Sequence, residues 1–368
     1  MNNILQWLVL VEDPRQQSKV KHLMKDIIAI VFFASLANAN EWIEIYLFAL
    51  TNEKHLRKYL SLPNGIPSHD TIQRVFAMVS PEYLKEFRKR WDEVMSGGMC
   101  KRVRKILALD GKTQRGNKTN GQKANHIVSA VTDTGFCVGE VLVDDKSNEI
   151  TAIPELLKCL NIKGHIITID AMGCQTNIAR LIKKGNADYV LNLKKNQGTL
   201  YDDVKLFFED NDFRNTCKYH KVLDKAHSSI EKREYWQTTD ISWLSQKKEW
   251  AGLNSIVMTR NTIIHNDVTA IEQRYFISSL PLNIDMVSYA IRSHWMVESY
   301  HWHLDVTFCE DANTTLEQVA SYNLNIIKKM AINTLRILDV GLEKVSMKNK
   351  RYMICMNFEY FLQALINL

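Results

Sequence analysis

The spacing of hydrophobic residues changes once along this chain, and that change limits what it can fold into more than any other feature. Between residues 22 and 95 the apolar residues recur at helical spacing, as in Leu23, Ile27 and Val31. After about residue 105, short apolar runs of strand length alternate with helical segments. We therefore expect a helical N-terminal region followed by an α/β fold.

The α/β region predicts a mixed sheet. Three strands come in quick succession, and further strands then alternate with helices. Residues 211–282 return to charged, strand-like segments, which we interpret as a β-rich insertion. The expected strands are 105–109, 126–131, 136–143, 165–169, 189–193, 230–238, 255–264 and 273–280, and the expected helices are 149–160, 175–184, 198–209 and 284–308.

A shift to basic composition at residues 101–105 marks a predicted domain boundary. With 368 residues, of which 46% are hydrophobic, the chain can bury a full core and divide into two or three domains. We predict an all-helical N-terminal domain over 1–98, an α/β domain over 99–312 that contains the insertion, and a helical C-terminal tail over 313–368.

One helix of the N-terminal region has a clear start signal. A Pro-Asn-Gly turn precedes Ser68, a residue type that caps helices, and the following helix carries Ile72 and Phe76 inward. A short loop and a capped helix resemble the second half of a helix-turn-helix, which binds DNA through its outer face. The alternative is an ordinary capped helix in a packing domain. The outer face would hold His69, Asp70, Gln73 and Arg74.

The net charge and the cysteine content limit which partners and which cellular compartment we expect for this protein. A formal net charge of +6 suits a polyanionic partner without identifying it. The seven cysteines include no CxxC pair, so neither a zinc clip nor a disulfide framework is expected. The N-terminus has no secretory pattern, and the apolar run 27–37 is too short to cross a bilayer. We expect a cytoplasmic protein without a membrane partner.

Two aspartates follow hydrophobic strands, in ILALD, ending at Asp110, and HIITID, ending at Asp170. Ligands of open α/β sheets bind at the carboxyl ends of the strands. If the two strands are neighbours, both carboxylates converge there and can share hard divalent cations. The alternative is that each aspartate only caps the turn or helix that follows it.

A third carboxylate, Glu298, lies in the long predicted helix. Helical spacing puts it on one face with Ile291, Trp295, Trp302 and Asp305, which we interpret as a core-facing aromatic stripe. A carboxylate there is costly unless it is paired or bound to metal. Glu298 is therefore the expected third ligand, and the alternative is a salt bridge with Arg292 or His294.

Other polar clusters compete with this triad. Asp144, Asp145 and Glu149 form one rival acidic cluster, and Glu310 with Asp311 forms another. The histidines 294, 301 and 303 do not favour a zinc site, because positions 301 and 303 diverge on a helix.

Three carboxylates without a Ser-His or Cys-His pair are typical of a site that catalyses phosphoryl transfer with metal ions. Two Mg²⁺ ions held by Asp110, Asp170 and Glu298 would activate a water or 3′-hydroxyl and stabilise the leaving oxygen in phosphodiester cleavage. Basic residues near the same sheet edge are placed to meet phosphates, although solvated loop lysines are common. They are Lys112, Arg115, Lys194 and Lys195.

These residues also carry a family resemblance. The strings GIPSHDTIQRVF, ALDGKTQRG, ITIDAMGCQ, YVLNLKKNQ and HWMVESYHWHLDVTFCEDA occur in this order and span nearly the whole chain. Together they resemble the bacterial insertion-sequence transposases with an Asp-Asp-Glu (DDE) triad, specifically the ISAs and H-repeat-associated group.

The resemblance implies a ribonuclease H-like core in which Asp110, Asp170 and Glu298 bind two Mg²⁺ or Mn²⁺ ions. It implies double-stranded DNA partners, namely the terminal inverted repeats of the element and target DNA, and a homo-oligomer on DNA in the bacterial nucleoid. Tyr289 and Arg292 resemble the tyrosine and arginine that precede the glutamate in related transposases, and this resemblance makes them expected DNA-binding residues. The spacing departs from those relatives, because Glu298 lies further from Arg292 and Asp305 stands where a lysine would follow.

Two other functions remain open from the sequence. A ribonuclease H-like nuclease or resolvase would cut without joining strands. A DNA-binding relative whose catalysis has decayed would do neither.

Overall fold

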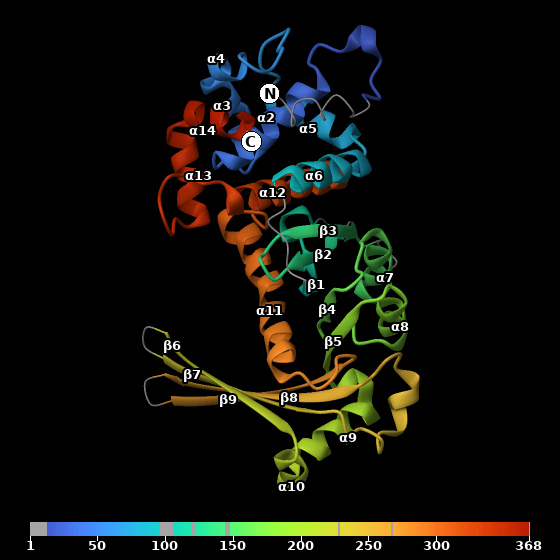
Figure 1. Cartoon of the computed structure of the whole chain (residues 1–368). Helices are drawn as coiled ribbons and strands as arrows, with labels where there is room; N and C mark the ends of the chain where they lie inside the picture. The colour runs from blue at the N-terminus through green and yellow to red at the C-terminus, as the bar shows by residue number, and fades with distance from the viewer. Residues whose placement is uncertain are drawn as a thin grey trace. The chain divides into compact units, whose positions relative to one another are not determined.

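The computed structural model describes residues 13–95, 106–118, 123–143, 148–226, 229–265 and 268–367 (Figure 1). The chain divides into two compact units. The helical unit comprises Met1–Lys101, Lys112–Ile127 and Ser299–Leu368, and the sheet unit comprises Arg102–Gly111 and Val128–Glu298. The chain passes from one unit to the other within β1, β2 and α11, so strands and a helix continue across the division.

One nine-stranded sheet runs in the order β3-β2-β1-β4-β5-β9-β8-β7-β6. The central strands β1, β4 and β5 are parallel, and β5, β9, β8, β7 and β6 pair antiparallel in turn. The predicted insertion therefore extends the same sheet instead of forming a separate one. The strands are β1 (Ile106–Thr113), β2 (His126–Thr132), β3 (Cys137–Leu142), β4 (Ile166–Ile169), β5 (Asp188–Leu193), β6 (Lys218–Ala226), β7 (Ser229–Thr238), β8 (Ser255–His265) and β9 (Val268–Ser278).

Helices cover both faces of the central strands (Figure 1). Because side chains alternate along a strand, Ile167 and Leu191 face the core under α7, α8 and α9, whereas Ile166 and Val190 face α11. The continuous apolar runs of β4 and β5 follow from burial on both faces. The helices are α7 (Glu149–Cys159), α8 (Thr176–Lys184), α9 (Gly198–Glu209), α10 (Asn211–Asn215) and α11 (Ile284–Trp302), with short 3₁₀ turns at Lys195–Gln197 and Ser245–Glu249.

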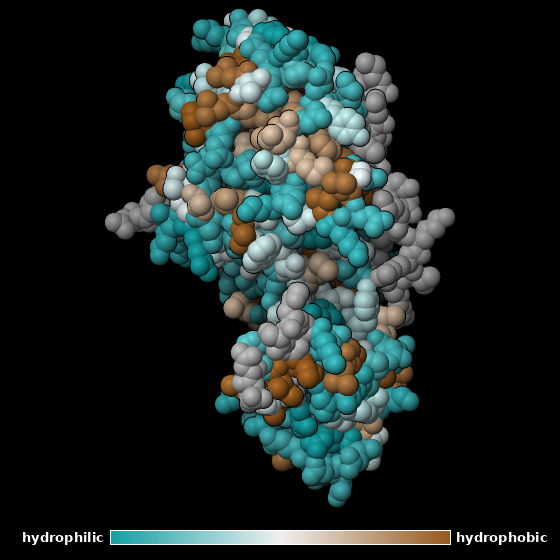
Figure 2. Space-filling model, turned by 90° about the vertical axis from the view of Figure 1, so that its left-hand side faces the viewer, coloured by the Kyte–Doolittle hydropathy of each residue, from teal (hydrophilic) through white to brown (hydrophobic). Residues whose placement is uncertain are grey.

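The far ends of β6 to β9 are exposed on both faces. The first six residues of β9 are exposed, and only its last four are buried. This end of the sheet unit faces the viewer in Figure 2 and carries brown, hydrophobic surface. The exposed apolar residues there are Leu223, Ile230, Ile263, Ile264, Val268 and Ile271. The alternating apolar residues at the far ends of β6 to β9 therefore do not pack in a core.

The helical unit is built around α12 (Gln318–Ile337), whose residues from Ala320 to Leu335 are buried. Its polar side chains hold the N-terminal helices: Asn323 donates to the carbonyls of Phe76 and Val79, at 2.7 and 2.8 Å. The other helices are α2 (Met24–Leu36), α3 (Trp42–Thr51), α4 (Glu53–Leu56), α5 (His69–Met78), α6 (Pro81–Met95), α13 (Met347–Met356) and α14 (Phe358–Asn367), with 3₁₀ turns at Gln17–Lys19 and Arg115–Asn117 and a π-helix at His303–Thr307.

The compact units divide the chain differently from the three predicted domains. The region 1–98, predicted as a helical domain, shares one unit with the region 313–368, predicted as a helical tail. The reason is α12, which contacts α2, α5 and α6 across more than 200 residues of sequence. The spacing of hydrophobic residues predicts each helix, but it does not predict which other helices pack against it. No helix in the described ranges is both long enough and apolar enough to span a membrane.

A buried charge cluster joins distant segments of the helical unit. The Nζ of Lys112 lies 2.7 Å from Asp305, 2.8 Å from Glu310 and 3.1 Å from Asp311. Burial by itself raises the pKa of Glu310, but Lys112 and Lys328 outweigh that effect and lower the pKa to about 2. Burial lowers the pKa of Lys328 to about 8. The cluster is therefore stable only while Glu310 is ionised.

We predict that Glu310→Gln destabilises the protein by about 3–5 kcal/mol at pH 7, because it leaves buried lysines without a counter-charge. The wild-type contribution exists above the ordinary carboxyl pKa of 4.5 and is lost as the pH falls toward about 2. The difference in unfolding free energy between the two proteins, measured in urea, should shrink over that pH range. Glu209→Gln, which removes an exposed partner of Lys205, should cost less than about 1 kcal/mol. A pH-independent difference would contradict this account.

Candidate active site

Asp110 and Asp170 lie at the same level of two neighbouring parallel strands. Leu109 pairs with Ile169 in the register of β1 and β4, and each aspartate is the next residue of its chain. The structure confirms that these strands are neighbours. The two carboxylates therefore meet at the edge where the parallel strands end.

The three predicted carboxylates line one cavity of the sheet unit. The cavity has a volume of about 470 Å³, and Asp110, Asp170 and Glu298 all face it. Asp110 comes from β1, Asp170 follows β4, and Glu298 lies on α11. Residues that are far apart in sequence are thus brought to one place by the β1–β4 pairing and the packing of α11 on the sheet.

The surroundings of Asp170 raise its pKa. The largest cause is burial, and the next is the negative charge of Asp110. The backbone N–H groups of Met172 and Gly173 donate to its Oδ1, at 3.0 and 3.4 Å, and oppose the shift. Asp170 therefore also caps the turn after β4, which was the alternative from sequence. The close turn needs Gly173, because a Cβ there would lie 2.3 Å from Cγ2 of Ile169.

The cavity also holds residues that the sequence analysis did not single out. Glu272 and Arg274 reach it from β9, and Asn192 reaches it from β5. The Oδ1 atom of Asn192 is buried and accepts no hydrogen bond from any described residue. A charged Glu-Gln-Arg run within a strand is the signal that could have pointed to β9, but the pairing of β9 with β5 is needed to place it.

The stripe predicted on α11 does not face the core. Trp295 is 41% exposed and Trp302 is 54% exposed, and Glu298 is exposed as well. The buried face of the helix carries small or aliphatic residues, such as Ala290 and Val297. Helical spacing finds residues that share a face, but it does not tell which face is buried. The argument that burial forces Glu298 to bind a cation is therefore wrong, although Glu298 does face the cavity.

The four residues predicted to bind phosphate, three lysines and one arginine, lie in different environments. Lys112 is held by the three carboxylates described above and its side chain is only 10% exposed, so it stabilises the helical unit instead of facing solvent. The side chain of Arg115 is 84% exposed, 3.7 Å from Asp311. Lys194 lines the carboxylate cavity, and Lys195 is exposed at the start of a 3₁₀ turn.

Tyr289 and Arg292 are both exposed on α11. The hydroxyl of Tyr289 donates to Asp133 at 2.7 Å. The guanidinium of Arg292 stacks on Trp295, with its Cζ 5.7 Å from the ring centroid. The other proposed partner of Glu298, His294, lines the cavity and lies 3.0 Å from Thr168 through Nδ1.

The rival acidic clusters fall outside this cavity or outside the described residues. Asp144 and Asp145 are not among the described residues, and neither are the basic residues 101–105. Glu149 is the first residue of α7, and its charge also raises the pKa of Asp170. Glu310 and Asp311 are committed to Lys112.

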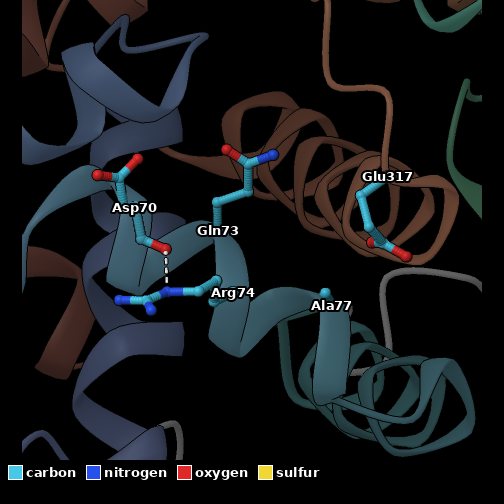
Figure 3. A pocket seen from close by; sticks show the side chains of 5 residues that line it. All are labelled: Asp70, Gln73, Arg74, Ala77 and Glu317. Carbon is cyan, nitrogen blue, oxygen red and sulfur yellow. Dashed lines mark hydrogen bonds between the residues drawn. The ribbon is translucent and has the colours of Figure 1, made fainter.

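A second cavity, of about 410 Å³, lies against α5 in the helical unit (Figure 3). Ser68 caps this helix as predicted, since its side chain accepts from the N–H of Thr71. Asp70, Gln73 and Arg74 line the cavity, as expected for the outer face, together with Glu317. The Nε of Arg74 donates to the carbonyl of Asp70 at 3.3 Å.

Comparison with known proteins gives the family. The model described as "Transposase DDE domain" matches residues 101–334, more than half of the chain. The chain belongs to the DDE transposase family. A second model, "DDE_Tnp_1-associated", matches residues 5–92.

Relatives that match nearly the whole of this chain agree with that membership. The chain is 36% identical to the "Putative transposase YncI" of Escherichia coli O157:H7, across 99% of this chain and 95% of that protein. It is 34% identical to the "H repeat-associated putative transposase YhhI" of Escherichia coli strain K12, across 94% of each. A shorter relative from that strain, the "Inactive transposase YbfQ", is 35% identical over 75 residues, or 20% of this chain. The expected membership of the DDE and H-repeat-associated transposases is thus confirmed.

We predict that Asp110→Asn lowers the pKa of Asp170, because it removes the negative charge with the largest effect on Asp170 while burial still raises that pKa. The pKa is measured by NMR titration of ¹³C-labelled aspartate carboxyls. Glu155→Gln, at an exposed position of α7, is the control and should leave the pKa of Asp170 unchanged. An unchanged pKa in Asp110→Asn would show that the two carboxylates do not interact.

Proposed function

We propose that this protein is a metal-dependent DNA transposase, which cuts DNA at the ends of an insertion sequence and joins the freed strands to target DNA. One observation carries the proposal: Asp110, Asp170 and Glu298, from three separate elements, line the same cavity. Membership of the DDE transposase family supports it.

A ribonuclease H-like core is part of this proposal. The parallel strands β1, β4 and β5, with β2 and β3 beside β1 and helices on both faces, support that assignment. The family model spans β1 to α12 and so includes the whole sheet.

The residues of the cavity fit hard divalent cations such as Mg²⁺ or Mn²⁺. Three carboxylates and the unpaired Oδ1 of Asn192 supply oxygen donors, the ligand type that Mg²⁺ prefers. Like charges at Asp110 and Asp170 raise the pKa of Asp170, and a cation would relieve that repulsion. Within the described ranges, no three His, Cys, Asp or Glu side chains lie close enough together to form a ready-made metal group.

In this proposal Asp110, Asp170 and Glu298 would hold two metal ions, which supply nucleophile activation and leaving-group stabilisation when bound. Lys194 and Arg274, at the same cavity, would orient the phosphate next to the scissile bond. Double-stranded DNA is the substrate, recognised at the element ends partly through the outer face of α5. The enzyme would act on paired ends as a homo-oligomer, associated with the bacterial nucleoid.

We expect Asp110→Asn, Asp170→Asn and Glu298→Gln each to reduce Mg²⁺-dependent cleavage of element-end DNA by roughly a thousand-fold or more, because each removes an electrostatic element of the transition state. Cleavage is measured on labelled DNA that carries the repeats flanking the gene. Glu155→Gln is the surface control and should cleave as the wild type does. Full activity in Asp110→Asn would remove the protein from this class of enzyme.

Joining separates the proposal from its rivals. With a pre-cut 3′ end, we expect a strand-transfer product in which the element end is linked to target DNA, because the 3′-hydroxyl replaces water as the nucleophile. Cleavage without this product would indicate a nuclease or resolvase. DNA binding without either reaction would indicate a decayed relative, the class suggested by the name of the inactive transposase YbfQ.

A further inference from the structure

A third cavity opens between β7–β9 and α11, inside the sheet unit. Its volume is about 330 Å³. The strand register puts Arg233, Asn261 and Glu272 in one row and Tyr235, Thr259 and Arg274 in the next. Both rows share a face of the sheet, because partners in a register point to the same side. From the other side, Arg292 and Trp295 of α11 line the same space.

Two guanidiniums lie over the ring of one exposed tryptophan in this cavity. The Cζ atoms of Arg274 and Arg292 lie 5.2 and 5.7 Å from the ring centroid of Trp295. A contact with a ring face uses none of a guanidinium's N–H groups, so Arg292 keeps a fork of donors for a phosphate. Arg274 donates from Nε and Nη2 to Glu272, at 2.8 and 3.1 Å, and keeps Nη1 for a phosphate. Trp295 is 41% exposed, and burial in a core therefore does not explain the arrangement.

The four arginines of the lining differ in how they are paired, and one of them, Arg260, lies over the ring of Trp236 with its Cζ 5.3 Å from the centroid. Arg233 has Asp224 and Glu231 as partners, at 2.7 and 2.5 Å, and Arg274 has Glu272 at 2.8 Å. Arg292 makes no ion pair with any carboxylate among the described residues. With four arginines against Glu231 and Glu272, the cavity lining carries two more positive than negative charges, and Arg292, which has no ion pair, lies over the ring of Trp295.

The position of Arg274 links this cavity to the carboxylates. Arg274 and Glu272 line both this cavity and the one that contains Asp110, Asp170 and Glu298. A polyanion lying along α11 would therefore pass from one cavity into the other.

We propose that Arg274, Trp295 and Arg292 form a phosphate clamp that binds the DNA backbone next to the bond being cut. This inference rests on the proposed function, because it takes DNA as the substrate of the neighbouring carboxylates. The clamp reads no sequence: it fixes the strand through phosphates that every DNA presents. The β-rich insertion thus contributes a binding residue, Arg274, to the active site.

The test measures binding of a fluorescent DNA duplex of arbitrary sequence without divalent ions, over a range of salt concentrations. Arg292→Gln and Arg274→Gln should each reduce the slope of log K against log salt by about one, the loss of one phosphate contact. Arg292→Gln breaks no described ion pair, so it should fold normally. Trp295→Leu keeps both charges but removes the stacking, and should weaken binding several-fold.

Lys221→Gln is the matched control. Lys221 is exposed on β6, and the register puts it with Glu234, on the opposite face of the sheet. It removes the same charge and should leave the slope unchanged. The clamp is overturned if the two arginine variants match Lys221→Gln, or if Trp295→Leu binds as tightly as the wild type. Failure of the wild type to cleave DNA would sink the proposed function but would leave this binding comparison intact.

Discussion

The parallel pairing of β1 with β4 is the interaction on which the rest of the structure depends. It sets Leu109 against Ile169, and so holds Asp110 and Asp170 side by side although they repel each other. That repulsion is tolerated because both strands are buried on both faces, and the packing of Ile166, Ile167 and their neighbours fixes the register. A slip of one residue would exchange the two buried faces, so the cores under α7 and under α11 keep the aspartates level.

The β-rich insertion forms part of the central sheet and contributes residues to the cavity of the three carboxylates. By pairing β9 antiparallel with β5, the chain brings Glu272 and Arg274 to the cavity that β1 and β4 open. Beyond that junction the strands extend into solvent, with apolar side chains such as Val268 and Ile271 exposed. One segment therefore has two environments: its base belongs to the core, and its outer half presents surface.

Local patterns in the sequence predicted the elements well and their partners poorly. The strand that carries Asp110, the strand that precedes Asp170 and the cap at Ser68 are read from neighbouring residues, and the structure has all three. The predicted end of the first strand is wrong, because β1 continues past Asp110 to Thr113. Lys112 was expected to meet phosphate, but its counter-charges, Glu310 among them, lie almost 200 positions away. The aromatic residues of α11 looked like core because hydropathy ignores that a tryptophan can also carry stacked arginines, as Trp295 does. The spacing of hydrophobic residues in a sequence does not show which charged or aromatic side chains will contact each other in the fold.

In two acidic clusters of this chain, the surroundings shift the pKa of a carboxylate in opposite directions. Glu310 is buried with lysines that overcome the cost of burial and lower its pKa, so the folded protein itself satisfies its charge. Asp170 is only half-buried, but burial raises its pKa, and the charged neighbour with the largest effect, Asp110, is another carboxylate that raises it further. The cations at the rim, Lys194 and Arg274, line the same cavity without reversing that shift. The fold therefore neutralises the charge of Glu310 with its own lysines but leaves the charges of Asp110 and Asp170 to repel each other, and in the proposed function bound metal ions would supply the missing positive charge.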